Sequence, residues 1–580
     1  MKAMRYLTMA VLALAGAMIT GCSNEDDATV QQPQGNRVVT LTTTVSLGGG
    51  ETRALDAAGV KTFAENDQIA IVYKNTGGQT VKAVSNKLGT SDIHDDGKKA
   101  TITVTLENPK AGGALRYIYP AAMAKGTIDA GATINDANTI NYDALAAQDG
   151  TLTTLASNLD LAVYDGTLTS EAALPASVAL TNQLCIGEFT IKNSDGSSDL
   201  TSTITGLWVS DGTNNYAVTR SASAGPIYVA MRPVASSATI TFAVQTASAY
   251  YERVVTGKSL TAGTMYPVGV RMTQTHTVNL ARLCNKYEAQ NGETLTGKLA
   301  LCKQISIKGG ATVTLNNVNI NGDNTFSGSF PGITCKGTAT LTLVGTNTVR
   351  GCKPSGFPGI YPKGTLTING TGKLFAYGNG NGTAGIGGGS DNSCISCGNI
   401  RIESGEITAE ATSSGGAGIG SSGRAGEDNS CGNITITGGT VTATGGDYAA
   451  GIGTGKASQG ISSNHTRKNI QCGDITISGG TVTATGGKGA AGIGLGYTGQ
   501  GYSNTATMNN KCGDITITNG VTSVTAIRGI AVSNHTPYCI GKGAADLHYS
   551  TLTCGTITIG GTNYTDGVPP TDGNTYVYNP

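Results

Sequence analysis

Short runs of alternating apolar and polar residues dominate the chain, and Gly, Asn and Asp separate these runs. Alternation with a period of two is typical of half-buried β-strands, and no stretch has the spacing of a long amphipathic helix. Between residues 37 and 272 the clearest runs are VVTLTTTVS, QIAIVYKN, ATITVTL, PIYVAMRP and ATITFAVQT. The pattern therefore predicts an all-β fold, with two β-sandwich domains at 37–160 and 161–272.

From residue 278 the pattern becomes a repeat. A Cys-Gly unit recurs every 34 to 42 residues and contains three short apolar pieces separated by glycines. In one unit these pieces are Ile475 with Ile477, Val482 with Ala484, and Ala491 with Ile493. Repeats of this length with three strands and three corners predict a right-handed parallel β-helix of about seven or eight coils over 278–580. We expect the paired glycines 479–480 and 486–487 to form corners with positive φ.

The N-terminus predicts export and lipidation. A basic start and the apolar run LTMAVLALAGAMIT precede ITGC, which resembles a bacterial lipobox with Cys22 as the lipidated residue. Residues 1–21 are then a signal peptide and 22–36 a tether, and SNEDD after the Cys resembles an acidic export tag. We expect a lipid-anchored outer-membrane protein that faces the cell exterior, with a fimbrium as the alternative location.

The charge composition of the chain limits the kinds of binding partner that we expect. Lys plus Arg and Asp plus Glu both number 38, and charged residues make up only 13% of the chain. A neutral chain without basic clusters does not favour nucleic-acid binding, because phosphate contacts require concentrated positive charge. We also expect no cofactor.

The first half of the chain resembles fimbrillins, the pilin-like lipoproteins of type V pili. The resemblance rests on TRALDAAGVKTFAENDQIAIVYKN at 52–75, SNLDLAVYDG at 157–166 and LTAGTMYPVGVRM at 260–272. It implies a two-domain transthyretin-like β-sandwich, a role in fimbriae or adhesion, and strand exchange with pilus subunits. It also implies proteolytic cleavage after Arg53; the alternative is that Arg53 is an ordinary exposed loop residue.

The order of the segments along the chain changes the expected part that this protein plays in strand exchange. The segment that fimbrillins donate to the next subunit here continues into the repeats at about residue 275, and NTYVYNP follows the last repeat. A subunit of this kind can accept a strand without passing one on. We therefore expect a tip adhesin or a stand-alone surface adhesin rather than a stalk pilin.

Five cysteines share one position of the repeat and should form a column along the β-helix, a structural Cys ladder. Two interpretations remain open, namely buried free thiols and disulfides between neighbouring coils, which an extracytoplasmic location allows. A metal site is disfavoured, because CISC is the only CxxC motif and no His follows at finger spacing. The five residues are Cys397, Cys431, Cys472, Cys512 and Cys554.

An enzyme that degrades polysaccharides is the main alternative function. Such an enzyme needs carboxylates and bases that converge from neighbouring coils. The outward positions are mostly Thr, and the exceptions lie on a single coil at Arg401, Glu403, Glu406 and Glu410. We therefore expect a protein that is not an enzyme.

Segments of variable length between the repeats are the candidate binding site, because solenoids often present ligand-binding loops along one edge. Tyrosines can stack on sugars, and basic side chains can donate hydrogen bonds to them. The alternative is that these insertions are merely tolerated, which would make the protein a structural spacer or a pilus subunit without ligand. The candidate glycan- or protein-binding residues are Tyr448, His465, Arg467, Lys468, Tyr497 and Tyr502.

Overall fold

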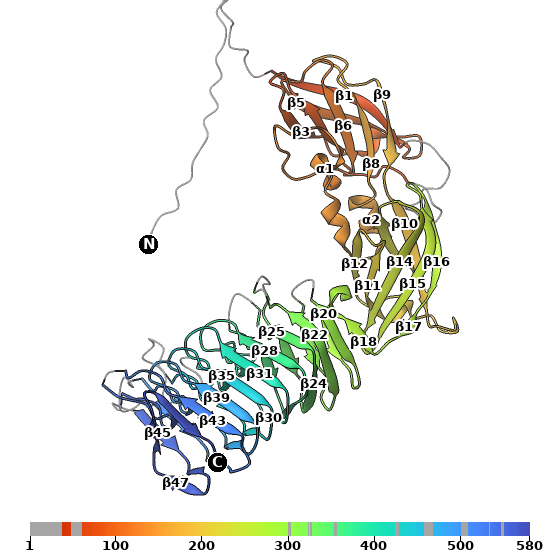
Figure 1. Cartoon of the computed structure of the whole chain (residues 1–580). Coiled ribbons are helices and arrows are strands. Elements are labelled where there is room, and N and C mark those ends of the chain that lie inside the picture. Colours follow the sequence, from red (N-terminus) through yellow and green to blue (C-terminus); the bar gives the residue numbers. More distant parts are fainter. Residues whose placement is uncertain are drawn as a thin grey trace, which may run out of the picture.

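Two β-sandwiches and a long β-helix follow one another along the chain in the computed structural model (Figure 1). The structure describes residues 37–47, 61–299, 303–322, 324, 328–352, 356–423, 428–457, 468–499, 508–532, 534–546 and 550–580. Cys22, Arg53, His465, Arg467 and Tyr502 lie outside these ranges, so their predicted roles remain predictions. Within the described ranges, no helix has the length and apolar character needed to cross a membrane.

The first sandwich is built from eight strands around one apolar core. Its strands alternate as expected; in β5, for example, Ala100, Ile102, Val104 and Leu106 are buried while the residues between them face outward. Strand β9 pairs with both β1 and β8 and so joins the two halves of the sheet. The strands are β1 (Val38–Leu47), β2 (Ala70–Lys74), β3 (Thr80–Val84), β4 (Ile93–His94), β5 (Lys99–Glu107), β6 (Ala114–Tyr119), β8 (Ala162–Thr167) and β9 (Ser177–Asn182).

The second sandwich packs a three-stranded sheet, β13-β10-β16, against a six-stranded sheet, β17-β15-β14-β11-β12-β7. Of two short helices, α1 (Asp136–Thr139) precedes its first strand, β7, and α2 (Leu152–Asn158) follows β7. Its strands are β7 (Ala147–Gln148), β10 (Cys185–Lys192), β11 (Ile204–Ser210), β12 (Asn215–Thr219), β13 (Ile227–Met231), β14 (Val234–Thr246), β15 (Tyr250–Leu260), β16 (Met265–Arg271) and β17 (Thr273–Gln274).

The predicted domain boundary at residue 160 does not separate the strands of the first sandwich from those of the second. Strand β7, before the boundary, pairs with β12 of the second sandwich. Strands β8 and β9, after it, belong to the first sandwich. The alternation pattern identifies strands but not their partners, because pairing depends on how distant segments meet.

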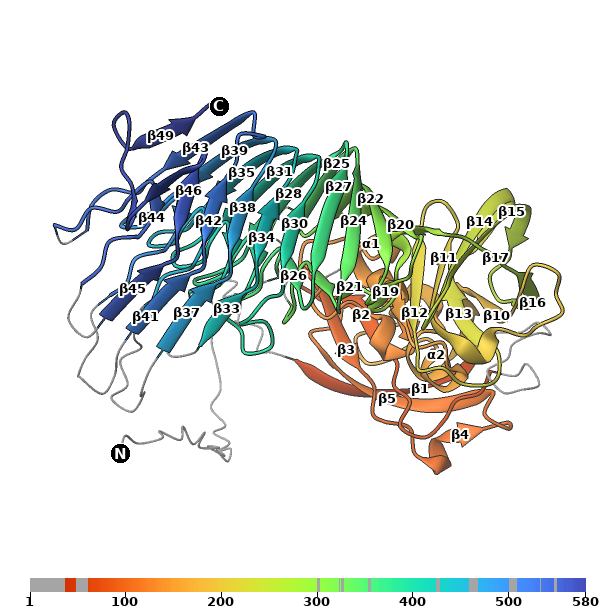
Figure 2. The same cartoon turned by 90° about the horizontal axis from the view of Figure 1, so that it is seen from below.

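Parallel strands stacked coil upon coil make up the β-helix, which confirms the predicted fold (Figure 2). Ile475, Ile477, Val482 and Ala484 are fully buried, and the threonines between them face outward. One stack contains β18 (Thr277–Asn279), β20 (Thr294–Lys298), β22 (Thr312–Ile320), β24 (Ala339–Val344), β27 (Leu366–Gly370), β30 (Ile400–Ile402), β34 (Ile434–Ile436), β38 (Ile475–Ile477), β42 (Ile515–Ile517) and β46 (Ile557–Ile559).

Two further stacks complete each coil. The first contains β25 (Thr346–Arg350), β28 (Lys373–Gly378), β31 (Glu406–Ala411), β35 (Thr440–Thr444), β39 (Thr481–Thr485) and β43 (Ser523–Ile527). The second contains β19 (Tyr287–Ala289), β21 (Ile305–Ile307), β23 (Ile333–Cys335), β26 (Ile360–Pro362), β29 (Ile386–Gly387), β32 (Ile419–Gly420), β36 (Ile452–Gly453), β40 (Ile493–Gly494) and β44 (Ile540–Gly541). These nine parallel strands exceed the seven or eight coils expected, because the early coils are shorter and less regular than the Cys-Gly repeats.

The later coils contain a fourth strand that the sequence did not indicate. Its stack is β33 (Asn429–Cys431), β37 (Lys468–Cys472), β41 (Met508–Cys512) and β45 (Ser550–Cys554). The predicted three strands per coil are therefore incomplete here, and Lys468 begins a strand rather than lying in a loop. Pairing between successive insertions satisfies backbone N–H and C=O groups that a buried loop would leave without partners.

Antiparallel strands cover the last coil. Strand β48 (Gly567–Val568) pairs with β44, β49 (Thr575–Tyr578) with β43, and β47 (Thr562–Tyr564) with β46. These pairings close backbone edges that could otherwise template association with another chain.

The glycines of the β-helix serve two different purposes. Gly480 adopts φ +79°, as expected for a corner, whereas the prediction of positive φ is wrong for Gly479, Gly486 and Gly487. A Cβ at Gly487 would collide with the carbonyl of Gly446 on the neighbouring coil, so close backbone stacking explains this glycine. A second column, which sequence analysis did not single out, has φ between +111° and +139° and contains Gly387, Gly420, Gly453, Gly494 and Gly541.

Candidate functional site

Tyr448 and Tyr497, predicted from separate insertions, contact each other at one edge of the β-helix. Their ring centroids lie 5.4 Å apart with the ring planes at 50°. Tyr448 lies in the turn between β35 and β36, and Tyr497 follows β40 on the next coil and donates its backbone N–H to the carbonyl of Tyr448 at 2.8 Å. Both side chains are half-buried, so each ring keeps some surface in contact with solvent.

Lys456 adds a cation to the tyrosine pair. Its Nζ stands 4.5 Å from the centroid of the Tyr448 ring, and burial lowers the pKa of this lysine. Lys456 and Tyr497 occupy the same position in successive repeats, which the sequence comparison of the repeats could have revealed. An ion pair between Asp447 and Lys488, at 3.4 Å, borders the cluster.

Apolar side chains extend the cluster toward the next coil. A Cβ added to Gly489 would lie 3.0 Å from both Tyr497 and Val532, so these two side chains flank the glycine. Ile530, whose carbonyl accepts the N–H of Gly489, is 59% exposed, the largest exposed fraction among the large apolar side chains described as exposed. We call Tyr448, Lys456, Tyr497, Ile530 and Val532 the edge patch.

Tyr448 has an unfavourable backbone conformation. Its φ is +72°, and the corresponding residue of the next coil is Gly489, with φ +66°. A positive φ costs a side-chain-bearing residue on the order of 1 kcal/mol, and such outliers concentrate at functional sites. A Tyr at a position suited to Gly indicates that its ring has a role other than stabilising the turn.

The acidic cluster that could support an enzyme is largely held in ion pairs. Lys373 on the coil below contacts Glu406 at 2.7 Å, and Arg401 contacts Glu403 at 2.7 Å. The hydrogen bond from Arg401 lowers the pKa of Glu403, which is the opposite of what a general acid needs at neutral pH. Glu410 stacks directly above Tyr377 in the parallel register, and Arg350 lies 4.1 Å from the ring of Tyr377.

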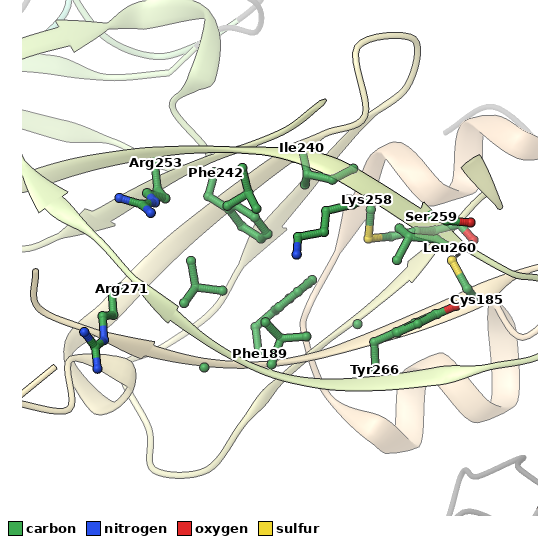
Figure 3. A pocket seen from close by; sticks show the side chains of 16 residues that line it. Cys185, Phe189, Ile240, Phe242, Arg253, Lys258, Ser259, Leu260, Tyr266 and Arg271 are labelled. Atoms are coloured by element: carbon green, nitrogen blue, oxygen red, sulfur yellow. Dashed lines mark hydrogen bonds between the residues drawn. The ribbon is translucent and has the colours of Figure 1, made fainter. Parts of the chain in front are cut away.

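A separate apolar pocket of about 500 Å³ opens in the second sandwich between β15 and β16 (Figure 3). Phe189, Phe242, Ile240 and Leu260 line its interior, while Arg253 and Arg271 lie at the end away from Cys185. In the described part of the chain, β16 pairs along one edge only, with β10. The pocket is therefore a seam between two sheets that are not joined on this side.

The predicted Cys ladder is present. In successive coils Cys397 pairs with Cys431, Cys431 with Cys472, Cys472 with Cys512, and Cys512 with Cys554. All five are free thiols; four are buried and Cys554 is partly exposed. The structure thus corresponds to the first of the two interpretations left open by the sequence.

The joint between the second sandwich and the β-helix is held by several side-chain contacts. Tyr250 and Tyr287 meet edge to face at 6.4 Å, and Arg282 pairs with Glu252 at 2.8 Å. The guanidinium of Arg282 also lies 5.3 Å from the ring of Trp208, the only tryptophan of the chain. The first residues of the β-helix share one apolar core with Ala243 and Tyr250 of the sandwich.

These features define an elongated all-β protein in which a parallel β-helix is fixed to a pair of β-sandwiches. The family model of a β-helix repeat matches residues 366–390, 434–456 and 475–497. No curated protein matches the chain.

Solved structures that resemble the chain include a fimbrial assembly protein from Parabacteroides distasonis, with 11% identity, a TM-score of 0.24, and coverage of 40% of this chain and 91% of that one. Another is described as a "putative cell adhesion protein" from Bacteroides fragilis, with 14% identity, a TM-score of 0.25, and coverage of 41% and 97%. A third, with the same description, comes from Bacteroides uniformis, with 15% identity, a TM-score of 0.23, and coverage of 42% and 98%.

Proposed function

We propose that the protein is a cell-surface adhesin whose β-helix presents the edge patch to a glycan. The observation that carries this proposal is the contact between Tyr448, Tyr497 and Lys456, in which two coils combine half-buried aromatic rings with a cation. Aromatic faces beside hydrogen-bond donors suit sugar rings, which have both apolar and hydroxyl-bearing surfaces. The positive φ of Tyr448 supports the same conclusion.

The protein acts without catalysis in this proposal. The pairing of Glu406 with Lys373 and of Glu403 with Arg401 supports this part, because both carboxylates are engaged by basic neighbours. Lipidation at Cys22 would tether the sandwiches to the outer membrane, and the joint would hold the β-helix away from the surface.

Replacing Tyr448 by Gly is expected to lower glycan binding at least tenfold while the fold is retained, because Gly relieves the positive φ but removes the ring. A glycan array with the full-length protein identifies a ligand, and titration calorimetry then compares the two proteins. Thr442→Ala on the outer face of β35 is the matched control and should bind as the parent does. Equal binding by the Gly variant would exclude the edge patch, and an array without any ligand would favour the spacer function.

We further propose that the sandwiches accept a strand from a pilus subunit but that this chain donates none. Two observations support this: among the residues that the structure describes, β16 has one unpaired edge beside an apolar seam, and the segment after it is held in place at both ends. Strand β17 pairs with β15, and β18, two residues further along, pairs with β20.

The purified protein, after cleavage at Arg53, is therefore expected to stay monomeric. Multi-angle light scattering measures its mass before and after treatment with an arginine-specific protease. Long homopolymers of the cleaved protein would contradict the proposal and would indicate a stalk subunit.

A further inference from the structure

Five thiols form one continuous column along the β-helix. Four of them end the strands β33, β37, β41 and β45 of the fourth stack (Figure 2), and Cys397 pairs with the first of these four. The sulfur atoms of Cys397 and Cys431 lie 2.7 Å apart. Strand register places Cys431 beside Cys472, Cys472 beside Cys512 and Cys512 beside Cys554. The thiols of Cys431, Cys472 and Cys512 also donate to the backbone carbonyls of Gly398, Gly432 and Gly473. Every cysteine except the two terminal ones therefore has a cysteine paired in register on each side.

This geometry permits a disulfide between any two neighbours. Residues paired in register on adjacent parallel strands have Cα atoms about 4.8 Å apart, within the range of about 4.4 to 6.8 Å found for disulfides. The contact between the sulfurs of Cys397 and Cys431 shows that two neighbouring side chains of the column point toward one another. Cysteines two coils apart are too distant to bond without rearrangement of the backbone.

The five cysteines also differ in their exposure to solvent. Cys397, Cys431, Cys472 and Cys512 are at most 8% exposed, whereas Cys554 at the end of the column is partly exposed. A reagent in solution therefore reaches the column most easily at Cys554. Because five is an odd number, complete oxidation must leave one thiol.

We propose that the column is a redox site. An oxidant enters at Cys554 and converts four of the five thiols into two disulfides between neighbouring coils. The fifth thiol then changes position along the column by thiol–disulfide exchange. The oxidant is a small-molecule disulfide, which an extracytoplasmic environment tolerates. This inference goes beyond the proposed adhesin function and does not depend on it.

Each disulfide of the column forms at the expense of one molecule of the small disulfide. The Cys554 thiolate attacks the small disulfide, forms a mixed disulfide and releases one small thiolate. The Cys512 thiolate then attacks the sulfur of Cys554, which forms the 512–554 bond and releases the second small thiolate. The two protons lost by the cysteines are taken up by the two small thiolates, so one disulfide is reduced for each one formed.

Exchange then moves the bond inward. The Cys472 thiolate attacks Cys512, the 472–512 bond forms, and Cys554 leaves as a thiolate that takes the proton lost by Cys472. Repeating this step with Cys431 attacking Cys472 frees Cys512, so that Cys512 and Cys554 can react with a second molecule of oxidant. Each step joins cysteines of adjacent coils only, because every attacking cysteine is paired in register with its target.

Oxidation should be slow at neutral pH and faster in alkali. The hydrogen bond with the preceding sulfur, followed by burial, raises the pKa of Cys431, Cys472 and Cys512 well above the ordinary value. The hydrogen bond with Cys512 and burial likewise raise the pKa of Cys554. Below these pKa values the thiolate fraction rises about tenfold per pH unit, so the rate should rise by up to about tenfold per unit between pH 7 and 9.

Oxidised glutathione tests the proposal on the reduced full-length protein. Trypsin separates the five cysteines at Arg401, Lys456, Lys488 and Arg528, so fragment-ion mass spectrometry can assign every link. We expect two links per chain, all between neighbours of the column, while Cys539, a buried thiol outside the column, stays reduced. N-ethylmaleimide added afterwards should label Cys554 in nearly every molecule, because exchange brings the remaining thiol to the accessible end.

Two variants, each with four column thiols, test whether oxidation begins at Cys554 or at any cysteine of the column. C397S should oxidise at the parental rate and give the single pattern 431–472 with 512–554. C554S should oxidise at least tenfold more slowly. Equal rates for the two variants, links between non-neighbours, or a column that stays reduced while the protein remains folded would each overturn the proposal.

Discussion

Replacing Gly420 by Ala is expected to destabilise the β-helix by about 4 kcal/mol or more, among the largest effects of a single substitution. Gly420 adopts φ +136°, which side-chain-bearing residues rarely adopt. A Cβ there would also stand 1.9 Å from the carbonyl oxygen of Gly453 on the next coil. That oxygen belongs to a stacked strand and cannot move without shifting the whole coil. Thermal unfolding followed by circular dichroism measures the loss.

Gly309→Ala is the matched control within the same domain. Its Cβ would lie 3.7 Å from the nearest atom, the Cα of Gly337, and its φ is not positive. This substitution should leave the melting temperature nearly unchanged. If both variants melted together with the parent protein, the close stacking of the glycine column would not be a determinant of stability.

Replacing Lys61 by Met is expected to destabilise the first sandwich by about 3–5 kcal/mol, because it leaves the Asp160 carboxylate buried without its cation. The two groups contact each other at 2.8 Å, and their side chains are only 3% and 2% exposed. Lys61 also lies 4.7 Å from the centroid of the Tyr119 ring, within the same core. Differential scanning calorimetry can follow the transition of this sandwich in the intact chain.

The double variant Lys61→Met with Asp160→Leu should recover most of the loss, since an apolar pair of similar volume can replace a buried ion pair at little cost. Lys99→Met, which breaks an exposed pair with Asp95, is the control and should cost far less stability than Lys61→Met, because water screens the exposed pair. A loss as large for Lys99→Met as for Lys61→Met would mean that burial does not explain the effect.

The first of these effects concerns a part that keeps the edge patch in position. The glycine column sets the distance between coils, and Tyr448 and Tyr497 meet across two of those coils. Under the proposed function, loss of the glycine column should therefore weaken ligand binding without any change in the side chains of the edge patch.

Within the β-helix, the sequence predicted the stacking of equivalent positions but not the fourth strand of the later coils. The register of the Cys ladder and the inward side chains of Ile475 and Val482 follow from the repeat itself. Each coil lies on a near copy of itself, so residues at equivalent repeat positions must become neighbours. The sequence therefore contained these contacts although they join residues about 40 positions apart.

The sequence alone determined the all-β class, the repeat and the column of cysteines, because alternation and repetition are encoded locally. Only the tertiary structure decided which side chains converge outside the repeat. The buried pair of Lys61 and Asp160, the exchange of β7 and β9 between the sandwiches, and the joint at Arg282 all bring together segments of unrelated sequence. Contacts of this kind depend on how the chain closes over long distances, and no local pattern specifies that closure.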